Sequence, residues 1–297
     1  MSNIKSIYEF LLWANCSNAC KFCWQKHLNQ QDKFLNTEQK IHSIQSVKAF
    51  LNSGEFVKGS HVLLVGGELF DFDMLPEFES LVGQIIEMMN RGEIELLYLN
   101  TNLLYQNLES LYYVLDLIQV NNLFSRLRFT TSFDIVGRFS SEARRDLMLN
   151  NMRKIKTKYP EINIVANIIL TKQACEKILA EEFSVKGFQD VYQIRVNTIP
   201  YIVLTEDMAA SKDLIFKTLL FLDKKMPGYL KAYVENFDLP QKKLLYEYTA
   251  GNENRLVFCS SDDDAKCGHS INFRKYSIEQ DSCFVCDIKK LLEMVEE

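Results

Sequence analysis

Three cysteines near the N-terminus have the spacing of a metal-binding loop. The segment CSNACKFC places Cys16, Cys20 and Cys23 in a C-x3-C-x2-C arrangement. A structural zinc site takes four protein ligands, whereas three thiolates suit an iron–sulfur cluster that keeps one iron open. An open iron can bind a substrate or a cofactor. We therefore expect an iron–sulfur cluster here, and the alternatives are three buried cysteines or a zinc site completed by His27.

A second set of cysteines lies close to the C-terminus. Cys259, Cys267, Cys283 and Cys286 offer four thiolates in a C-x7-C-x15-C-x2-C arrangement. Four thiolates can ligate a [4Fe–4S] cluster completely or form a structural zinc site, and C-x2-C occurs in both. We interpret residues 229–297 as a small cysteine-rich metal-binding region.

Composition narrows the class of protein. The chain has 297 residues, 47% of them hydrophobic, and a net charge of −5 without any block of Lys or Arg, which argues against long nucleic acid as a partner. No uncharged apolar run reaches the ~18 residues of a membrane span, and no export signal is recognisable. We expect a cytoplasmic protein whose eight cysteines stay reduced.

Short apolar segments alternate with helical patterns from residue 8 to residue 225, and residues 1–228 read as one domain. We predict strands near residue 8 and at 61–65, 94–100, 127–133, 162–170 and 191–197. We predict helices at 37–51, 74–90, 106–120, 141–159, 172–183 and 208–225. Six strand–helix units predict an α/β fold with a parallel sheet, either a partial barrel or a doubly wound open sheet. In both, ligands bind where the strands end.

Polar and glycine residues follow the first four strands directly. The cysteine loop follows the first strand, and the other residues are Gly66, Gly67 and Glu68 after the second, Thr101 and Asn102 after the third, and Ser132, Asp134 and Arg138 after the fourth. In this order they resemble the radical S-adenosylmethionine (radical SAM) superfamily. Its signature loop is C-x3-C-x-aromatic-C, with Phe22 as the aromatic residue here. The resemblance implies a partial (β/α)6 barrel, with SAM chelating the open iron of the cluster.

The same resemblance assigns roles to these residues. Phe22 would lie near the adenine of SAM, and Glu68 of the GGE motif would accept a hydrogen bond from its ammonium group. The family often carries Thr-Asn-Gly after the third strand, where Leu103 here replaces the glycine. Ser132 and Asp134 would contact the ribose or carboxylate of SAM. Arg138 would pair with that carboxylate, or be a surface charge.

The strands after these carry weaker signals. Asn167 or Ile169 on the fifth strand would contact the adenine. Arg195 and Asn197 close the sixth strand, where they either face the cavity or cap the rim of the barrel. The Cys259 to Cys286 region resembles the auxiliary-cluster tails called twitch or SPASM domains, which favours a second [4Fe–4S] cluster over zinc.

The implied activity is that of a radical SAM enzyme. Such an enzyme cleaves S-adenosylmethionine reductively to a 5′-deoxyadenosyl radical, which abstracts hydrogen from a substrate. We expect a peptide substrate, with a small metabolite or nucleotide as the alternative, and an electron donor such as flavodoxin or ferredoxin. The hypothesis from another class is a non-catalytic, zinc-stabilised binding protein.

Overall fold

The computed structural model places most of the barrel region of the chain. It describes residues 7–13, 15–18, 20, 35–71, 74–136, 139, 141–199, 208–232, 243–249 and 252–257, the last two ranges as backbone only. Several predicted site residues lie outside the described residues, namely Phe22, Cys23, His27, Arg138, Cys259, Cys267, Cys283 and Cys286.

The predicted parallel sheet is confirmed. Its first six strands are β1 (Ile7–Leu11), β2 (Ser60–Val65), β3 (Ile94–Thr101), β4 (Leu127–Ser132), β5 (Ile164–Ile169) and β6 (Arg195–Ile199). They are hydrogen-bonded in the order β6-β5-β4-β3-β2-β1, all in parallel. A doubly wound sheet reverses its strand order, whereas this order follows the chain without a reversal. The fold is therefore α/β, a partial (β/α)6 barrel.

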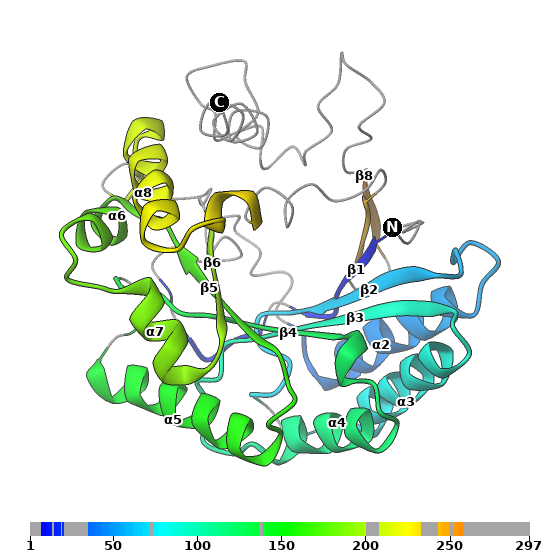
Figure 1. Cartoon of the computed structure of the whole chain (residues 1–297). Coiled ribbons are helices and arrows are strands. Elements are labelled where there is room, and N and C mark those ends of the chain that lie inside the picture. The colour runs from blue at the N-terminus through cyan, green and yellow to red at the C-terminus, as the bar shows by residue number, and fades with distance from the viewer. Residues whose placement is uncertain are drawn as a thin grey trace.

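Helices cover one side of this sheet. They are α2 (Thr37–Leu51), α3 (Pro76–Asn90), α4 (Glu109–Val120), α5 (Glu142–Lys158), α6 (Lys172–Leu179), α7 (Val185–Tyr192) and α8 (Lys212–Lys225), with a 3-10 turn, η2, at Phe124–Arg126. Figure 1 shows β1 to β6 following an arc, with α2 to α5 along its outer side. The crossovers place the carboxyl ends of the six strands at one edge of the sheet.

Local hydrogen bonds set the starts of two helices. The predicted helix 37–51 is confirmed as α2, and Asn36 caps it, because the side chains of Asn36 and Gln39 bond each other's backbone N–H groups at 2.9 Å. The predicted helix 172–183 ends earlier, at Leu179, and a separate helix that was not predicted, α7, begins after Ser184, whose hydroxyl accepts from the Gly187 N–H. The sixth strand consequently begins only at Arg195.

The side of the sheet that faces the helices forms the core. Leu97, Leu99, Phe129 and Ile164 occupy neighbouring positions on β3, β4 and β5, and each is at most 1% exposed. At the other end, Tyr8 packs against Phe50 of α2. Each large apolar side chain buried in this way contributes about 1.5–3 kcal/mol to stability.

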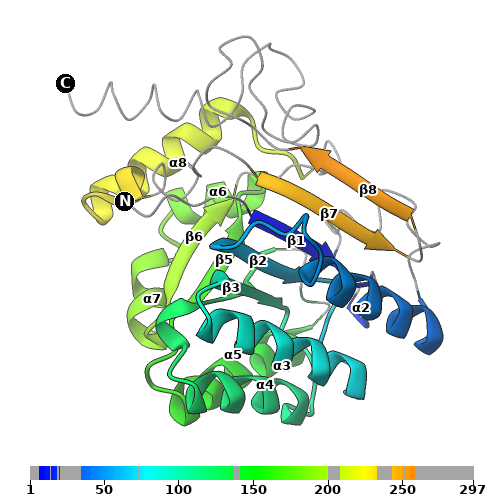
Figure 2. The ribbon, with the colours of Figure 1, turned by 90° about the vertical axis from the view of Figure 1, so that its right-hand side faces the viewer.

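Two further strands extend the sheet beyond β1. Strand β7 (Lys243–Thr249) pairs in parallel with β1, and β8 (Asn252–Val257) pairs in antiparallel with β7. Figure 2 shows both strands continuing the sheet above β1. The sequence pattern did not predict them, although KLLYEYT has the β-rich composition of a strand. The predicted domain boundary at residue 228 stays a prediction.

No helix among the described residues combines the length and apolar character that a membrane crossing needs.

Candidate functional site

The cysteine loop and the GGE segment run side by side where β1 and β2 end. The Gly67 N–H donates to the Trp13 carbonyl at 2.8 Å, and the Glu68 N–H donates to the Asn15 carbonyl at 2.8 Å. The Trp13 indole N–H returns a hydrogen bond to the Glu68 carbonyl at 3.0 Å. These bonds extend the parallel pairing of the two strands past their ends, and fix the first residues of the loop against Glu68.

Asn15 holds the two ends of the loop together. Its side-chain amide donates to the Leu35 carbonyl at 3.1 Å, and its side-chain oxygen accepts from the Leu35 N–H at 2.8 Å. The two bonds resemble a pair of hydrogen bonds between neighbouring strands. They join Asn15, just before residues 16–34, to Leu35, just after them. The sequence did not predict this residue, and its position directly before Cys16 was the available signal.

Two of the three loop cysteines lie in the described part of the chain. The Asn18 backbone N–H donates to Cys16 Sγ at 3.4 Å, and the Asn18 side-chain amide donates to Cys20 Sγ at 2.9 Å. Asn102 Nδ2, from the end of β3, donates to Cys16 Sγ at 3.4 Å. Burial raises the pKa of the Cys16 thiol to about 12, with a smaller contribution from the nearby Glu68 carboxylate.

Glu68 is buried and joins the ends of β2 and β3. Its carboxylate accepts from the Thr101 hydroxyl at 2.8 Å, from the Asn102 N–H at 2.5 Å and from the Phe70 N–H at 3.2 Å. The residue is 1% exposed. Burial raises its pKa to about 7, and the three hydrogen bonds oppose that change only in part.

Gly66 is needed for packing. A Cβ atom at this position would lie 2.8 Å from Leu69 Cδ2 and 3.0 Å from the Trp13 carbonyl oxygen. From the sequence, the two glycines were expected to let a ligand approach the backbone. For Gly66 the structure shows close approach of two protein segments, the GGE turn and the strand end that carries the cysteine loop.

The turn after β3 keeps a conformation that favours glycine, even though it contains leucine. Leu103 has φ 57° and is fully buried. The Leu104 N–H donates to Asn102 Oδ1 at 2.7 Å, which closes the turn. From α5, the buried Asn151 amide donates to the carbonyls of Leu103 at 3.1 Å and Tyr105 at 2.8 Å. Asn151 was not predicted, because its partners lie 48 and 46 residues away.

The end of β4 contributes polar groups at the same edge. Ser132 is half-buried opposite Asn167 of β5, and Asp134 is buried just beyond the strand. Arg144 lies in the first turn of α5, which begins close by in the chain. Its Nε and Nη2 atoms are shielded from solvent and have no hydrogen-bond partner among the described residues. It was not predicted as a site residue.

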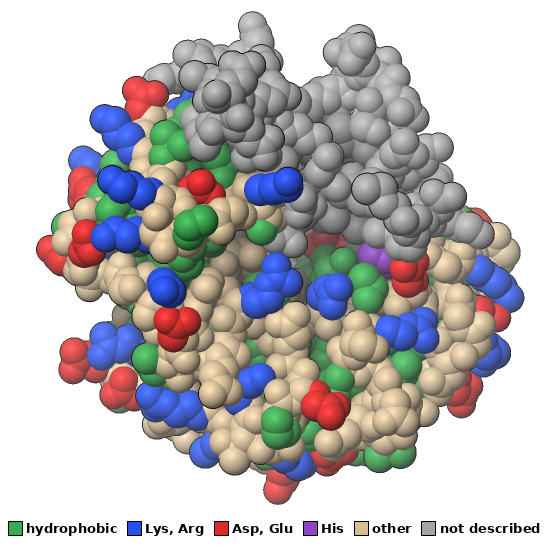
Figure 3. All heavy atoms as spheres, in the orientation of Figure 1, with side chains coloured by type: hydrophobic (Ala, Val, Ile, Leu, Met, Phe, Trp, Pro, Cys, Tyr) green, Lys and Arg blue, Asp and Glu red, His purple; other side chains and the backbone are tan. Residues whose placement is uncertain are grey.

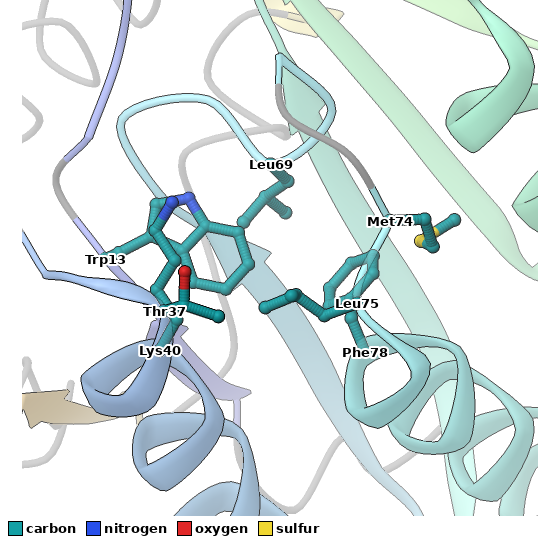
Figure 4. Close-up of a pocket in the computed structure, with 7 residues that line it drawn as sticks. All are labelled: Trp13, Thr37, Lys40, Leu69, Met74, Leu75 and Phe78. Atoms are coloured by element: carbon teal, nitrogen blue, oxygen red, sulfur yellow. The ribbon is translucent and has the colours of Figure 1, made fainter.

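A cavity of about 370 Å³ lies between the starts of α2 and α3. Its walls are Trp13, Thr37, Lys40, Leu69, Met74, Leu75 and Phe78. Figure 4 shows Lys40 beside Trp13, and its Nζ atom is 5.2 Å from the centre of the indole ring. Burial lowers the pKa of Lys40. Cys16, Glu68 and Asn102 are not among its described walls, so it is not the predicted cofactor site.

The remaining described cysteine is a small buried residue of the core. Cys175 on α6 is fully buried, and burial raises its pKa to about 11. Among the described residues no group of three His, Cys, Asp or Glu side chains is placed to hold a metal ion. Cys23, the third predicted ligand of the loop, lies outside them.

Comparisons with solved structures agree with the fold. Native anSMEcpe with bound AdoMet is similar, with a TM-score of 0.54 at 10% identity, over 96% of this chain and 95% of that one. The crystal structure of HydG, a maturase of the [FeFe]-hydrogenase, gives a TM-score of 0.40 at 13% identity, over 76% of this chain and 50% of that one. No family model and no curated protein matches the sequence. The likeness to anSMEcpe defines the class of fold, a partial (β/α)6 barrel.

Proposed function

We propose that this chain is a radical SAM enzyme whose Cys16, Cys20 and Cys23 hold a [4Fe–4S] cluster. One observation carries the proposal. The cysteine loop is bonded to Glu68, and through Cys16 to Asn102, at the carboxyl edge of a partial (β/α)6 barrel. The similar fold of anSMEcpe, solved with bound AdoMet, supports the same function.

The described residues fit such a cluster. Cys16 and Cys20 supply soft sulfur ligands, and the N–H groups of Asn18 and Asn102 already point to their sulfurs. Hydrogen bonds to cluster sulfurs help to set the reduction potential. When bound, the cluster supplies the electron that cleaves S-adenosylmethionine to methionine and a 5′-deoxyadenosyl radical, which takes hydrogen from the substrate.

The neighbouring residues would orient S-adenosylmethionine. Glu68 would accept a hydrogen bond from the ammonium group of S-adenosylmethionine. A carboxylate has about four lone-pair sites, and three protein donors already use three of those of Glu68, so one site is left for the ammonium group. A cation there would favour the ionised carboxylate. The guanidinium of Arg144, shielded and without a described partner, suits the carboxylate of S-adenosylmethionine. Ser132 at the end of β4 would contact the ribose or the carboxylate of S-adenosylmethionine.

Other parts of the proposal rest on the sequence. The Cys259 to Cys286 region would hold an auxiliary [4Fe–4S] cluster in a twitch-like or SPASM-like tail, with zinc as the alternative. The substrate would be a peptide, or else a small metabolite or nucleotide. A flavodoxin or ferredoxin would supply electrons in the cytoplasm.

The test is an anaerobic purification followed by iron and sulfide counting and an assay for 5′-deoxyadenosine. We expect iron and sulfide in the wild type, and 5′-deoxyadenosine once S-adenosylmethionine and dithionite are added. The triple Cys16→Ala, Cys20→Ala, Cys23→Ala variant should lose that product, while the buried Cys175→Ala control keeps it. Zinc without iron in the wild type would instead support the binding-protein hypothesis.

A further inference from the structure

Over β4, β5 and β6, the side of the sheet that faces away from the helices is mainly polar. Because paired residues of parallel strands share a side, the residues that alternate with the buried core residues all lie on this second side. On β4, β5 and β6 they are Arg128, Thr130, Ser132, Val165, Asn167, Ile169, Arg195 and Asn197. In an ordinary closed barrel such positions are filled by bulky apolar side chains.

Two arginines on this side have no hydrogen-bond acceptor among the described residues. Arg128 is half-buried and Arg195 is exposed, and neither makes a hydrogen bond or an ion pair within the described part of the chain. The outer surface seen in Figure 3 differs from this inner side, because acidic and basic side chains are interspersed on it. Many surface cations are paired, for example Lys225 with Glu181 at 2.9 Å and Arg91 with Glu93 at 2.9 Å.

The acidic groups of the same side lie on the other strands. Glu9 is on β1, separated from Arg128 in its row by Leu63 and Tyr98. Glu95 Oε2 lies 4.0 Å from His61 Nε2. The β4 to β6 half therefore has two cations and several uncharged hydrogen-bonding groups, but no carboxylate within the strands themselves.

The two arginines are close enough to share one ligand. They are separated by two strand spacings, about 10 Å, and by one two-residue step along the strands, about 7 Å. Val165 of β5 lies in the row of Thr130 and Arg195, so an anion bound over Val165 would be within reach of both long side chains. Arginine presents a rigid fork of N–H donors that matches a carboxylate or a phosphate.

We propose that this half of the inner side binds the substrate through an anionic group, a carboxylate or a phosphate, held between Arg128 and Arg195. The assignment of the anion as a substrate rests on the proposed function. The amides of Asn167 and Asn197 add uncharged contacts to the remainder of the substrate. A substrate without a negative charge would leave both guanidinium groups without a partner.

Arginine labelling tests this without knowledge of the substrate. The full-length, anaerobically purified protein is treated with phenylglyoxal, and labelling is followed at each arginine by peptide mass spectrometry. The probes are inorganic phosphate, N-acetylglutamate and the neutral diamide N-acetylglutaminamide. Either anion should slow labelling of Arg128 and Arg195 about twofold at its dissociation constant, where half of the sites are occupied. The paired surface residue Arg91 is the control and should not change.

The outcomes separate the two proposals. In the Arg128→Gln variant neither anion should protect Arg195, because the two residues share the ligand. Phosphate protecting more strongly than N-acetylglutamate would identify a phosphate-bearing substrate, and the reverse a carboxylate. Equal protection by the neutral N-acetylglutaminamide, or no protection by either anion in a protein that forms 5′-deoxyadenosine, would overturn this inference alone. A protein with no iron and no 5′-deoxyadenosine would overturn the proposed function, and with it the anion's role as a substrate.

Discussion

The buried Glu68 carboxyl makes the stability of the metal-free protein depend on pH. Its pKa rises from an ordinary 4.5 to about 7, because burial disfavours the charged form more than its hydrogen bonds favour it. At 1.36 kcal/mol for each pKa unit, the full effect is at most about 3 kcal/mol. The folded state binds the proton more tightly than the unfolded state does. This stabilisation is therefore fully present below pH 4.5 and is lost as the pH rises through 7.

The variant that isolates this effect is Glu68→Gln. Its side-chain carbonyl can accept from the Asn102 N–H, and its amide can donate to the Thr101 hydroxyl oxygen. The Thr101 hydroxyl would then donate to the Tyr105 hydroxyl, which lies 3.0 Å away. The glutamine has no proton to lose, so the variant should gain stability over the wild type as the pH rises. From pH 5 to pH 8.5 we expect a relative gain of about 2.5 kcal/mol.

The assay is urea unfolding of the cluster-free chain at pH values from 5 to 8.5, with the wild type and the variant compared at each value. Other groups that titrate in this range cancel in the difference between the two proteins. Glu142→Gln is the matched control, because this carboxylate is 87% exposed and should give a flat difference. A flat difference for Glu68→Gln as well would refute the reasoning, since Glu68 would then titrate at its ordinary pKa.

Four further variants, at three positions, test how the site is held. Asn15→Ala should lower the free energy of unfolding by about 1–3 kcal/mol and reduce iron incorporation, because both hydrogen bonds to Leu35 are lost. An unchanged iron content would show that these two hydrogen bonds do not hold the loop for metal binding. Leu103→Ala should cost about 3–5 kcal/mol in urea unfolding, and Leu103→Gly about 1 kcal/mol less, because glycine tolerates φ 57°. If instead Leu103→Gly were less stable than Leu103→Ala, as is usual for glycine and alanine, the turn would not be strained. Asn151→Ala should lower the free energy of unfolding by about 2–4 kcal/mol in the same measurement, since two buried carbonyls lose their donor. A loss of only about 0.5 kcal/mol, which is typical of surface substitutions, would contradict this prediction.

The sequence predicted the arc of six strands because each strand is an apolar segment followed by a longer helical pattern. It placed Gly66 to Glu68 and Asn102 at strand ends, which is where they lie. It missed β7, whose pairing with β1 joins residues more than 200 positions apart in the chain, and β8, which pairs with β7. It also missed Asn15, whose function depends on Leu35 being brought close by the fold.

Asn102 explains how the turn after β3 functions without the expected glycine. Its N–H binds the Glu68 carboxylate, its side-chain amide reaches Cys16 Sγ, and its side-chain oxygen accepts from the Leu104 N–H. Aspartate at this position would present no N–H to the sulfur, and a shorter residue would reach neither partner. The turn is thus set by the hydrogen bonds of Asn102, together with those from Asn151 to the carbonyls that follow.

Burial compensates for the remaining strain at Leu103. A left-handed backbone costs a leucine about 1–2 kcal/mol, whereas removing a fully buried leucine side chain costs about 3–5 kcal/mol. Burial contributes more free energy than the backbone strain costs. Leucine is therefore favoured at position 103, although glycine was expected there. The same turn positions the Asn102 side chain so that it donates to Cys16 Sγ. The conformation at the end of β3 therefore affects any metal that the loop binds.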